Sequence, residues 1–488
     1  MLFQEITDRI LRALRSGAAG NASSIVEDVK AASRRPREIT DLPRDYFEGR
    51  HLGHFKAFLG THYKRAMRKN EILPVAPALV RTWCETESDI YRNGQPHRKA
   101  QNDAATARIE ALCRQAETES ALPEAEVRAV AGRQMFLRVG RNPLTDRVEI
   151  TRHWPDAVWV VANGAAPTSL EHAHAVMIQR GPELYEIWRK VPGGWSAEQI
   201  DHNADNPTIK PVFEADAVYA GRLPIVALRT GLLEGSPYLC DNADMIDVAN
   251  VHMLLWTEAT HVARHQAHNP IIYSGNDDDI TPEAGPGGIT RISGNATMTA
   301  LQVNPQIDQL RELTNDFGGA IARSRGQSPR ANSVNPPPLN SGVALRVDNQ
   351  IAEEKRPQRV SLFRRFERLE LLPVLDEVER LQAPQDPTNR IPAADIDWDA
   401  VRVTFPRAPT IEDPAQRNLR LEHAQTTGWI SPARAATEAG YYENIEEAVD
   451  AGLSNTAQPS ESVTTDLGTS GERGPAPSIT QNGNRNND

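Results

Sequence analysis

The stretch Asn340–Leu381 reads NSGVALRVDNQIAEEKRPQRVSLFRRFERLELLPVLDEVERL and carries apolar residues at helical spacing. Asn340 and Ser341 are suitable N-cap residues, so the helix is expected to begin there. At 1.5 Å per residue, a helix of about forty residues would be about 60 Å long, which exceeds a small globular core. Pro357 and Pro373 each lack a backbone donor, so we expect the helix to be kinked.

The predicted helix has one apolar stripe with charges beside it. Leu362, Phe366 and Leu369 form the stripe. The charged residues of this region are expected largely outside it: Arg359, Arg364, Arg365, Arg368, Glu367 and Glu370. A long structural helix in many kinds of protein would explain this spacing. The polar, proline-rich run RSRGQSPRANSVNPPPLNSG, which leads directly into the helix, is a more distinctive feature.

Two further helices precede that run and enclose a compact glycine-rich segment. Residues Tyr238–Gln266 have a broad apolar stripe, and the pattern stops at Asn269-Pro270. The segment that follows contains short strand-like runs, and a second helix is predicted over Gln306–Arg323. The order is therefore helix, small β-rich excursion, antiparallel helix, proline-rich loop and long helix.

Upstream of these helices the apolar period changes from helical to two. MFLRVG, VEITRHWPDAVWVVAN, AHAVMIQR, ELYEIWRK and PIVALRT are short runs rich in β-branched and aromatic residues, with a turn at Pro192-Gly193-Gly194. They predict an antiparallel β region within a mainly helical chain. The expected fold class is α+β.

Both ends of the chain have distinct patterns. Leu2, Phe3, Ile6, Ile10, Leu11 and Leu14 lie on one face of a predicted helix, which suggests a docking helix, and we expect no secretion signal. Towards the other end, Asp397–Phe405 is a predicted strand, and helices are predicted over Ile411–Gly428 and Ala433–Gly452. Residues 454–488 have almost no apolar content and are expected to be disordered.

The order of these segments resembles that of tailed-bacteriophage portal proteins, head-to-tail connectors that form a ring at one capsid vertex. The resemblance implies a portal-like α+β fold with long stem and wing helices, a small β-rich clip, an antiparallel β wing region and a helical crown. In this sequence it assigns the wing to residues 1–240, stem helices to 241–268 and 306–325, the clip to 269–305, the tunnel loop to 326–340, the kinked wing helix with its following strand to 341–405, the helical crown to 406–453 and the tail to 454–488.

The same resemblance implies a function and a set of partners. The chain would form a homo-oligomeric ring, dodecameric in the virion, through which double-stranded DNA is packaged by the terminase large subunit and later ejected. The major capsid protein and head-completion (adaptor) proteins would be its other partners, with assembly in the host cytoplasm and no membrane. A net charge of -11 suits a conduit through which DNA slides, and argues against a protein that grips phosphates with many cations.

Two groups of residues are candidate contacts under this hypothesis. Those expected to touch DNA from the tunnel loop are Arg323, Arg325, Arg330, Asn332, Asn335 and Asn340, because arginine binds phosphate without reading bases. Arginines that favour a helix C-terminus would explain Arg323 and Arg325 equally. Asp277, Asp278 and Asp279 are candidates for partner docking in the clip, or form a solvated turn.

An enzyme is not expected, although one alternative involves a metal. His261 and His265 are four residues apart on one predicted helix, but HVARH lacks the glutamate of H-E-x-x-H and no third ligand is marked. No P-loop, G-x-S-x-G or dinucleotide motif occurs, so we predict no cofactor and no metal. A virion structural or scaffold-like protein without a channel, and a metal-dependent hydrolase, stay as alternatives.

Overall fold

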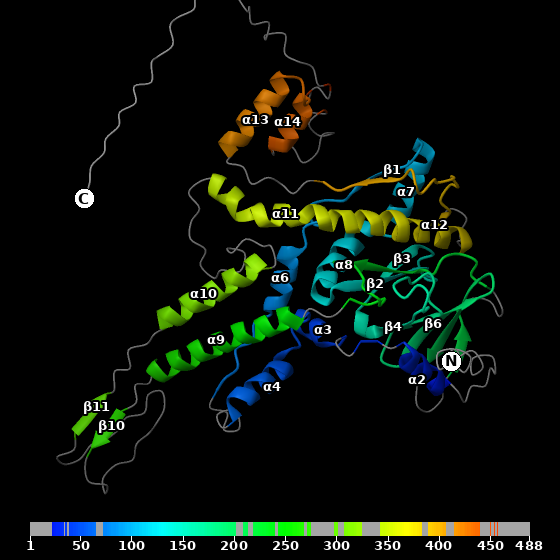
Figure 1. Ribbon diagram of the computed structural model, residues 1–488. Coiled ribbons are helices and arrows are strands. Elements are labelled where there is room, and N and C mark those ends of the chain that lie inside the picture. The colour runs from blue at the N-terminus through cyan, green and yellow to red at the C-terminus, as the bar shows by residue number, and fades with distance from the viewer. Residues whose placement is uncertain are drawn as a thin grey trace, which may run out of the picture. The chain divides into compact units, whose positions relative to one another are not determined.

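The computed structural model describes the greater part of the chain and divides it into two compact units. The described residues are 22–33, 35–36, 39–64, 72–201, 208–212, 218–239, 243–267, 271–274, 297–300, 307–324, 342–382, 389–406, 414–439, 449, 453 and 456. The first unit takes in residues 1–339 and 343–410, and the second takes in 340–342 and 411–488. The fold is α+β, as the change of period predicts (Figure 1).

The first unit contains two larger antiparallel sheets. One has the strand order β3-β2-β9, and the other is the meander β4-β5-β6-β7-β8. Gly193, at φ +88°, lies in the predicted turn between β6 and β7, where Val191 pairs with Gly194. The strand bounds are β2 (Gln134–Arg141), β3 (Val148–His153), β4 (Val158–Val161), β5 (Ala175–Gln179), β6 (Leu184–Val191), β7 (Gly194–Asp201), β8 (Thr208–Pro211) and β9 (Ile225–Arg229).

Short helices cover these sheets. α8 packs on β2, β3 and β9, while α2 packs on β4. Tyr238 joins the two sheets, because its hydroxyl donates to Val158 and accepts from the Val160 N–H of β4 while its ring meets Phe136 of β2 edge-on. The described α-helices that precede β9 in the chain are α2 (Ala22–Ala32), α3 (Leu42–Phe47), α4 (Leu52–His62), α6 (Leu79–Glu87), α7 (Asp103–Gln115) and α8 (Thr118–Gly132).

The predicted long helix is present as three consecutive segments: α11 (Gly342–Phe366), a π-helical turn η5 (Glu367–Leu371) and α12 (Leu372–Leu381). The α-helix continues through Pro357, and the π turn ends two residues before Pro373. Since Pro373 has no N–H for the carbonyl of Leu369, that carbonyl accepts a hydrogen bond of 3.0 Å from the Arg222 guanidinium instead. The disturbance expected at Pro373 therefore takes the form of a π turn.

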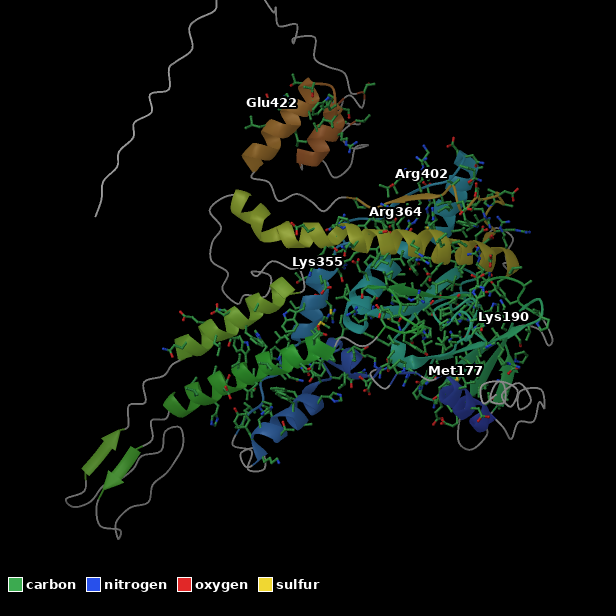
Figure 2. All side chains as sticks on the ribbon, in the orientation of Figure 1. Met177, Lys190, Lys355, Arg364, Arg402 and Glu422 are labelled. Carbon is green, nitrogen blue, oxygen red and sulfur yellow. The ribbon has the colours of Figure 1, made fainter. Side chains whose placement is uncertain are left out.

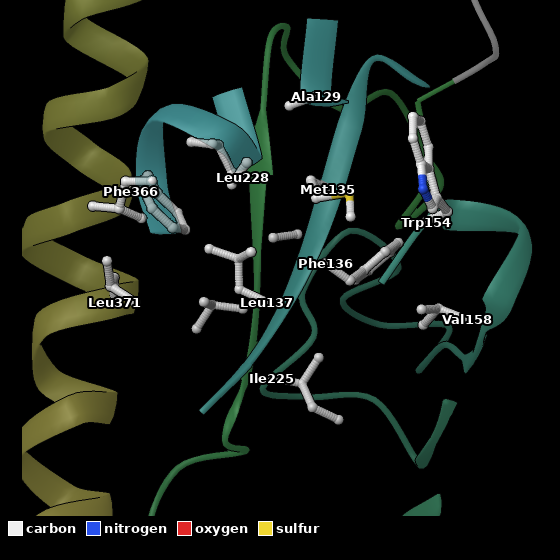
Figure 3. Close-up of a cluster of buried hydrophobic side chains, with 14 of the residues drawn as sticks. Ala129, Met135, Phe136, Leu137, Trp154, Val158, Ile225, Leu228, Phe366 and Leu371 are labelled. Atoms are coloured by element: carbon white, nitrogen blue, oxygen red, sulfur yellow. The ribbon is translucent and has the colours of Figure 1, made fainter. Parts of the chain in front are cut away.

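The buried face of this helix overlaps the predicted stripe only at Phe366. Phe363 and Phe366 are buried, whereas Leu362 and Leu369 are only partly buried. Figure 3 shows Phe366 and Leu371 beside Leu137 and Leu228 of the three-stranded sheet. The long helix thus closes the main hydrophobic core of the first unit.

The expectation that Glu367 lies outside the buried stripe is wrong. This carboxylate is fully buried and receives two hydrogen bonds from Arg98 of β1 (His97–Lys99), at 2.7 and 2.8 Å. β1 pairs with β12 (Arg402–Thr404), a shorter strand than the predicted Asp397–Phe405. Arg364 of α11 donates to the Val403 carbonyl of β12, close to Arg402 in Figure 2. The Arg98 guanidinium holds the buried Glu367 carboxylate with two parallel hydrogen bonds, and this pair joins the long helix to the edge of the core.

A second buried arginine secures α12. Arg108 of α7 donates to Asp376 at 2.6 Å and to Glu379 at 2.7 Å, and its remaining donors reach the carbonyls of Ile391 and Pro392. All three side chains are less than 10% exposed. Each charge in this cluster has a partner, which is the condition under which buried ion pairs persist.

The second unit contains two described helices, α13 (Pro414–Thr426) and α14 (Pro432–Ala439). Gly428, at φ +72°, follows α13, and the Trp429 N–H donates to the Ala424 carbonyl at 2.8 Å. The Ser431 hydroxyl accepts from the Arg434 N–H, so Ser431 caps α14.

None of the described helices is both long enough and apolar enough to span a lipid bilayer.

The Glu367→Ala variant tests the buried pair. Removing the carboxylate leaves the Arg98 guanidinium buried without a counter-charge, so we expect the free energy of unfolding to fall by about 3–5 kcal/mol. Denaturant unfolding followed by circular dichroism measures the loss. The double variant Arg98→Met/Glu367→Leu should recover most of it.

The matched control is Glu85→Ala, which removes an exposed partner of Arg81 from α6. Its expected cost is at most about 0.5 kcal/mol. Equal losses for Glu367→Ala and Glu85→Ala would show that the buried pair does not secure the long helix.

Candidate functional site

The elements that the resemblance assigns to stem and clip follow one another in the chain. α9 (Ala243–Ala267) leads to β10 (Ile271–Ser274), and β11 (Thr297–Ala300) leads to α10 (Ile307–Ser324). β10 and β11 pair antiparallel, from Ile271 with Ala300 to Ser274 with Thr297. α9 and α10 contact each other and lie side by side in Figure 1. A two-stranded ribbon thus connects two paired helices.

Apolar residues hold the first turns of α9 in the core of the first unit. Met245, Ala249 and Met253 are buried at helical spacing. Trp83 of α6 meets the ring of His252 edge-on, at 6.2 Å between centroids. Burial lowers the pKa of His252, so the neutral imidazole is favoured there. This histidine serves packing.

Polar contacts continue the attachment along α9. Tyr46 of α3 donates to Asn250 at 2.5 Å, and the Val75 N–H donates to the Thr257 hydroxyl at 3.1 Å. Tyr63 donates to Glu258, and burial together with that carboxylate raises the pKa of Tyr63 to about 12. Contacts thus extend over four turns of α9, so that this part of the helix is fixed relative to α3 and α4.

The structure describes one of the predicted contact residues, Arg323. Arg323 is the penultimate residue of α10. The helix dipole favours a cation at this end of a helix. The other candidates of the tunnel loop, and those of the clip, lie outside the described residues: Arg325, Arg330, Asn332, Asn335, Asn340, Asp277, Asp278 and Asp279. They stay predictions.

The metal alternative rests on His261 and His265. Both belong to α9, but the description covers only the backbone of His265. Within the described part of the chain, no three side chains of His, Cys, Asp or Glu gather as they would around a metal ion.

Sequence reasoning missed the buried carboxylates Glu367, Asp376 and Glu379. A local signal existed, since each lies four residues after an apolar residue that is also buried: Phe363, Leu372 and Leu375. Four residues along a helix is the same face, so an acid at that spacing is a candidate for a buried ion pair.

Of the comparisons with known proteins, the one with solved structures gives matches. No family model and no curated protein matches the chain. Among solved structures, a chain from the neck of an empty gene transfer agent particle computed with C6 symmetry is 12% identical, covering 73% of this chain and 88% of that one, with a TM-score of 0.37.

Two further matches come from the same kind of particle. A chain from the neck of the native particle computed with C12 symmetry is 13% identical over 83% of this chain and 94% of that one, with a TM-score of 0.36. A chain from the virion of the native gene transfer agent is 12% identical over 74% and 88%, with a TM-score of 0.31. At such identities and scores, this similarity does not place the chain in a family.

The Tyr46→Phe variant tests the attachment of α9. It leaves the buried amide of Asn250 without its donor, so we expect a loss of about 1–3 kcal/mol in the free energy of unfolding. The double variant Tyr46→Phe/Asn250→Leu replaces both partners and should be closer to the parent. Urea unfolding measures both, and an unchanged midpoint for Tyr46→Phe would contradict the role of this contact.

Proposed function

We propose that this chain is the subunit of a phage portal ring, through which terminase packages double-stranded DNA and to which head-completion proteins attach. The observation that carries the proposal is the order of the described elements. A helix pair with a β ribbon between its members is rooted in an α+β body. After residues 325–341 the chain continues as the long helix α11–η5–α12.

The attachments of the two helical parts support this assignment. A channel wall must keep its shape while DNA passes through it. α9 is secured to the core by both apolar packing and hydrogen bonds from three segments. The long helix is secured by buried ion pairs, of which Arg98–Glu367 is bidentate, while Arg108 bridges Asp376 and Glu379. In the proposed ring α9 and α10 are the stem, β10 and β11 belong to the clip, and α13 and α14 belong to the crown.

The mechanism that follows is passive. The ring lines the channel, and the residues between α10 and α11 follow the DNA. Arg325 and Arg330 contact backbone phosphates without reading bases. The net charge of -11 disfavours tight binding elsewhere on the chain. Asp277, Asp278 and Asp279 are proposed to face terminase or adaptor proteins. ATP hydrolysis is supplied by terminase.

Negative-stain electron microscopy with native mass measurement tests the ring. Twelve copies of the 53.9 kDa chain give a hollow particle of about 647 kDa, which we expect without added DNA or metal. A virion scaffold without a channel would give no hollow ring. A small, compact oligomer that retains stoichiometric zinc would contradict the proposal and favour His261 and His265 as a metal site.

Duplex DNA binding to assembled rings tests the loop. The slope of log affinity against log salt is negative, and each arginine removed from a phosphate contact should reduce its magnitude by about 0.9. Arg325→Ala and Arg330→Ala are therefore each expected to flatten it. Fluorescence anisotropy at several salt concentrations measures the slopes. Arg402→Ala, on the exposed face of β12, is the control, and the loop has no DNA contact if all slopes agree.

A further inference from the structure

α10 has an apolar strip on the side that faces away from its buried residues. Leu313 is 52% exposed, and Ala320, seven residues later, is exposed as well. Seven residues are close to two helical turns, so both side chains lie on one face, with the partly buried Phe317 beside them. The buried residues Thr314 and Ala322 lie on the other side of the helix. The described part of the chain thus leaves this α10 strip open to solvent.

α4 has a smooth strip of small residues on its exposed side. Gly53, Ala57 and Gly60 lie on one face at helical spacing, and a side chain at either glycine would meet open space. Phe55 and Leu59 are buried on the other side of the helix. Small residues let another helix approach closely, because its larger side chains find room between the turns. This α4 strip is therefore suited to receive a ridge such as the α10 strip.

The charges beside the two strips have opposite signs. Glu312 and Asp316 are exposed along one border of the α10 strip, one helical turn apart. Lys56 on α4 and Lys64 just beyond its end are exposed as well. Within the described part of the chain, none of these four side chains has an ion-pair partner. Both surfaces thus combine apolar area with unpaired charge, and each has the sign that the other lacks.

α9 separates the two strips within one copy. It contacts both α10 and α4, and Figure 1 shows it between these two helices. The α10 strip therefore cannot reach the α4 strip of its own copy. In a ring, each copy presents one patch to the neighbour on one side and a different patch to the neighbour on the other. Two complementary strips on either side of α9 meet this requirement.

The charges also lie at about the same level along α9. Tyr63 donates to Glu258 of α9, which places the next residue, Lys64, at that level. Glu258 lies nine residues before the end of α9, and Asp316 lies nine residues after the start of α10. The ribbon of β10 and β11 joins these two ends, and both helices rise about 1.5 Å per residue, so Asp316 reaches the level of Glu258 too.

The directions of the helices bring the strips into register. The ring of Tyr46, which donates to Asn250 near the start of α9, stacks on the residue that precedes α4. α4 therefore runs in the direction of α9, whereas α10 returns in the opposite direction. Gly60 lies four residues before the lysine and Ala320 four residues after the aspartate, so both lie about 6 Å from these charges towards the start of α9.

We propose that the α10 strip of one copy packs on the α4 strip of the neighbouring copy, with Asp316 facing Lys64. This inference rests on the proposed ring, and it names the surfaces that join its subunits. The ring axis follows α9, so rotation from one copy to the next keeps the levels of the two charges. Apolar side chains exclude water at the centre of the contact, and the charges at its border select the orientation.

Charge reversal on the full chain tests this pairing. Asp316→Lys places two lysines together, and Lys64→Asp places two acids together, so each variant alone should need about tenfold more protein for half-assembly. An equal mixture of both variants restores opposite charges at every contact of an alternating ring and should assemble like the parent. Native mass measurement gives the particle and its content of each variant.

The matched control is Glu183→Lys, which makes the same change of charge in the exposed turn between β5 and β6. It should leave assembly unchanged. Reversals at the α10 and α4 strips that affect assembly no more than this control would overturn the pairing.

A disulfide tests the contact without relying on charge. With Ala320→Cys and Gly60→Cys in one chain, oxidation should link each copy to the next and give a ladder of covalent oligomers on a non-reducing gel. Each single variant lacks the opposing thiol and should give no ladder. A double variant without a ladder overturns the inference, and the portal function survives that result if the parent still forms rings. A ladder without closed rings would instead support the contact and contradict the portal function.

Discussion

The buried contacts between guanidinium and carboxylate groups hold the first unit together. Arg98 and Arg108 come from a strand and a helix early in the chain, and their partners Glu367, Asp376 and Glu379 come from the long helix near its end. A buried charge without a partner costs several kcal/mol, so each side fixes the other's position. The sheets, the covering helices and the root of α9 are then arranged around a helix that is fixed in both position and rotation.

Periodicity predicts the elements of this fold well. Helices were expected over Tyr238–Gln266 and Gln306–Arg323, and the observed α9 and α10 differ from these bounds by at most five residues. The β region is found where the period changes to two. These patterns are informative because each element buries one face against the core, and that face repeats with the geometry of the element.

The same reasoning fails where the decisive contact is distant in sequence. Arg98 lies 269 residues before Glu367, and nothing local to either residue announces the other. Treating every charge as solvated placed Glu367 outside, although it follows the buried Phe363 by one turn. The candidate DNA and docking residues were assigned by resemblance alone, and Arg323 is the one whose position in an element is described.

The π turn before Pro373 has a consequence for rotational phase along the long helix. In a regular α-helix each residue advances about 100°, so Glu379, twelve residues after Glu367, would be rotated by about 120° from it. A π turn adds one residue without advancing the rotation, which reduces this angle to about 20°. Glu367 and Glu379 therefore point in nearly the same direction, one towards Arg98 and the other towards Arg108. One inserted residue acts as a phase correction that brings two anchors onto a common face.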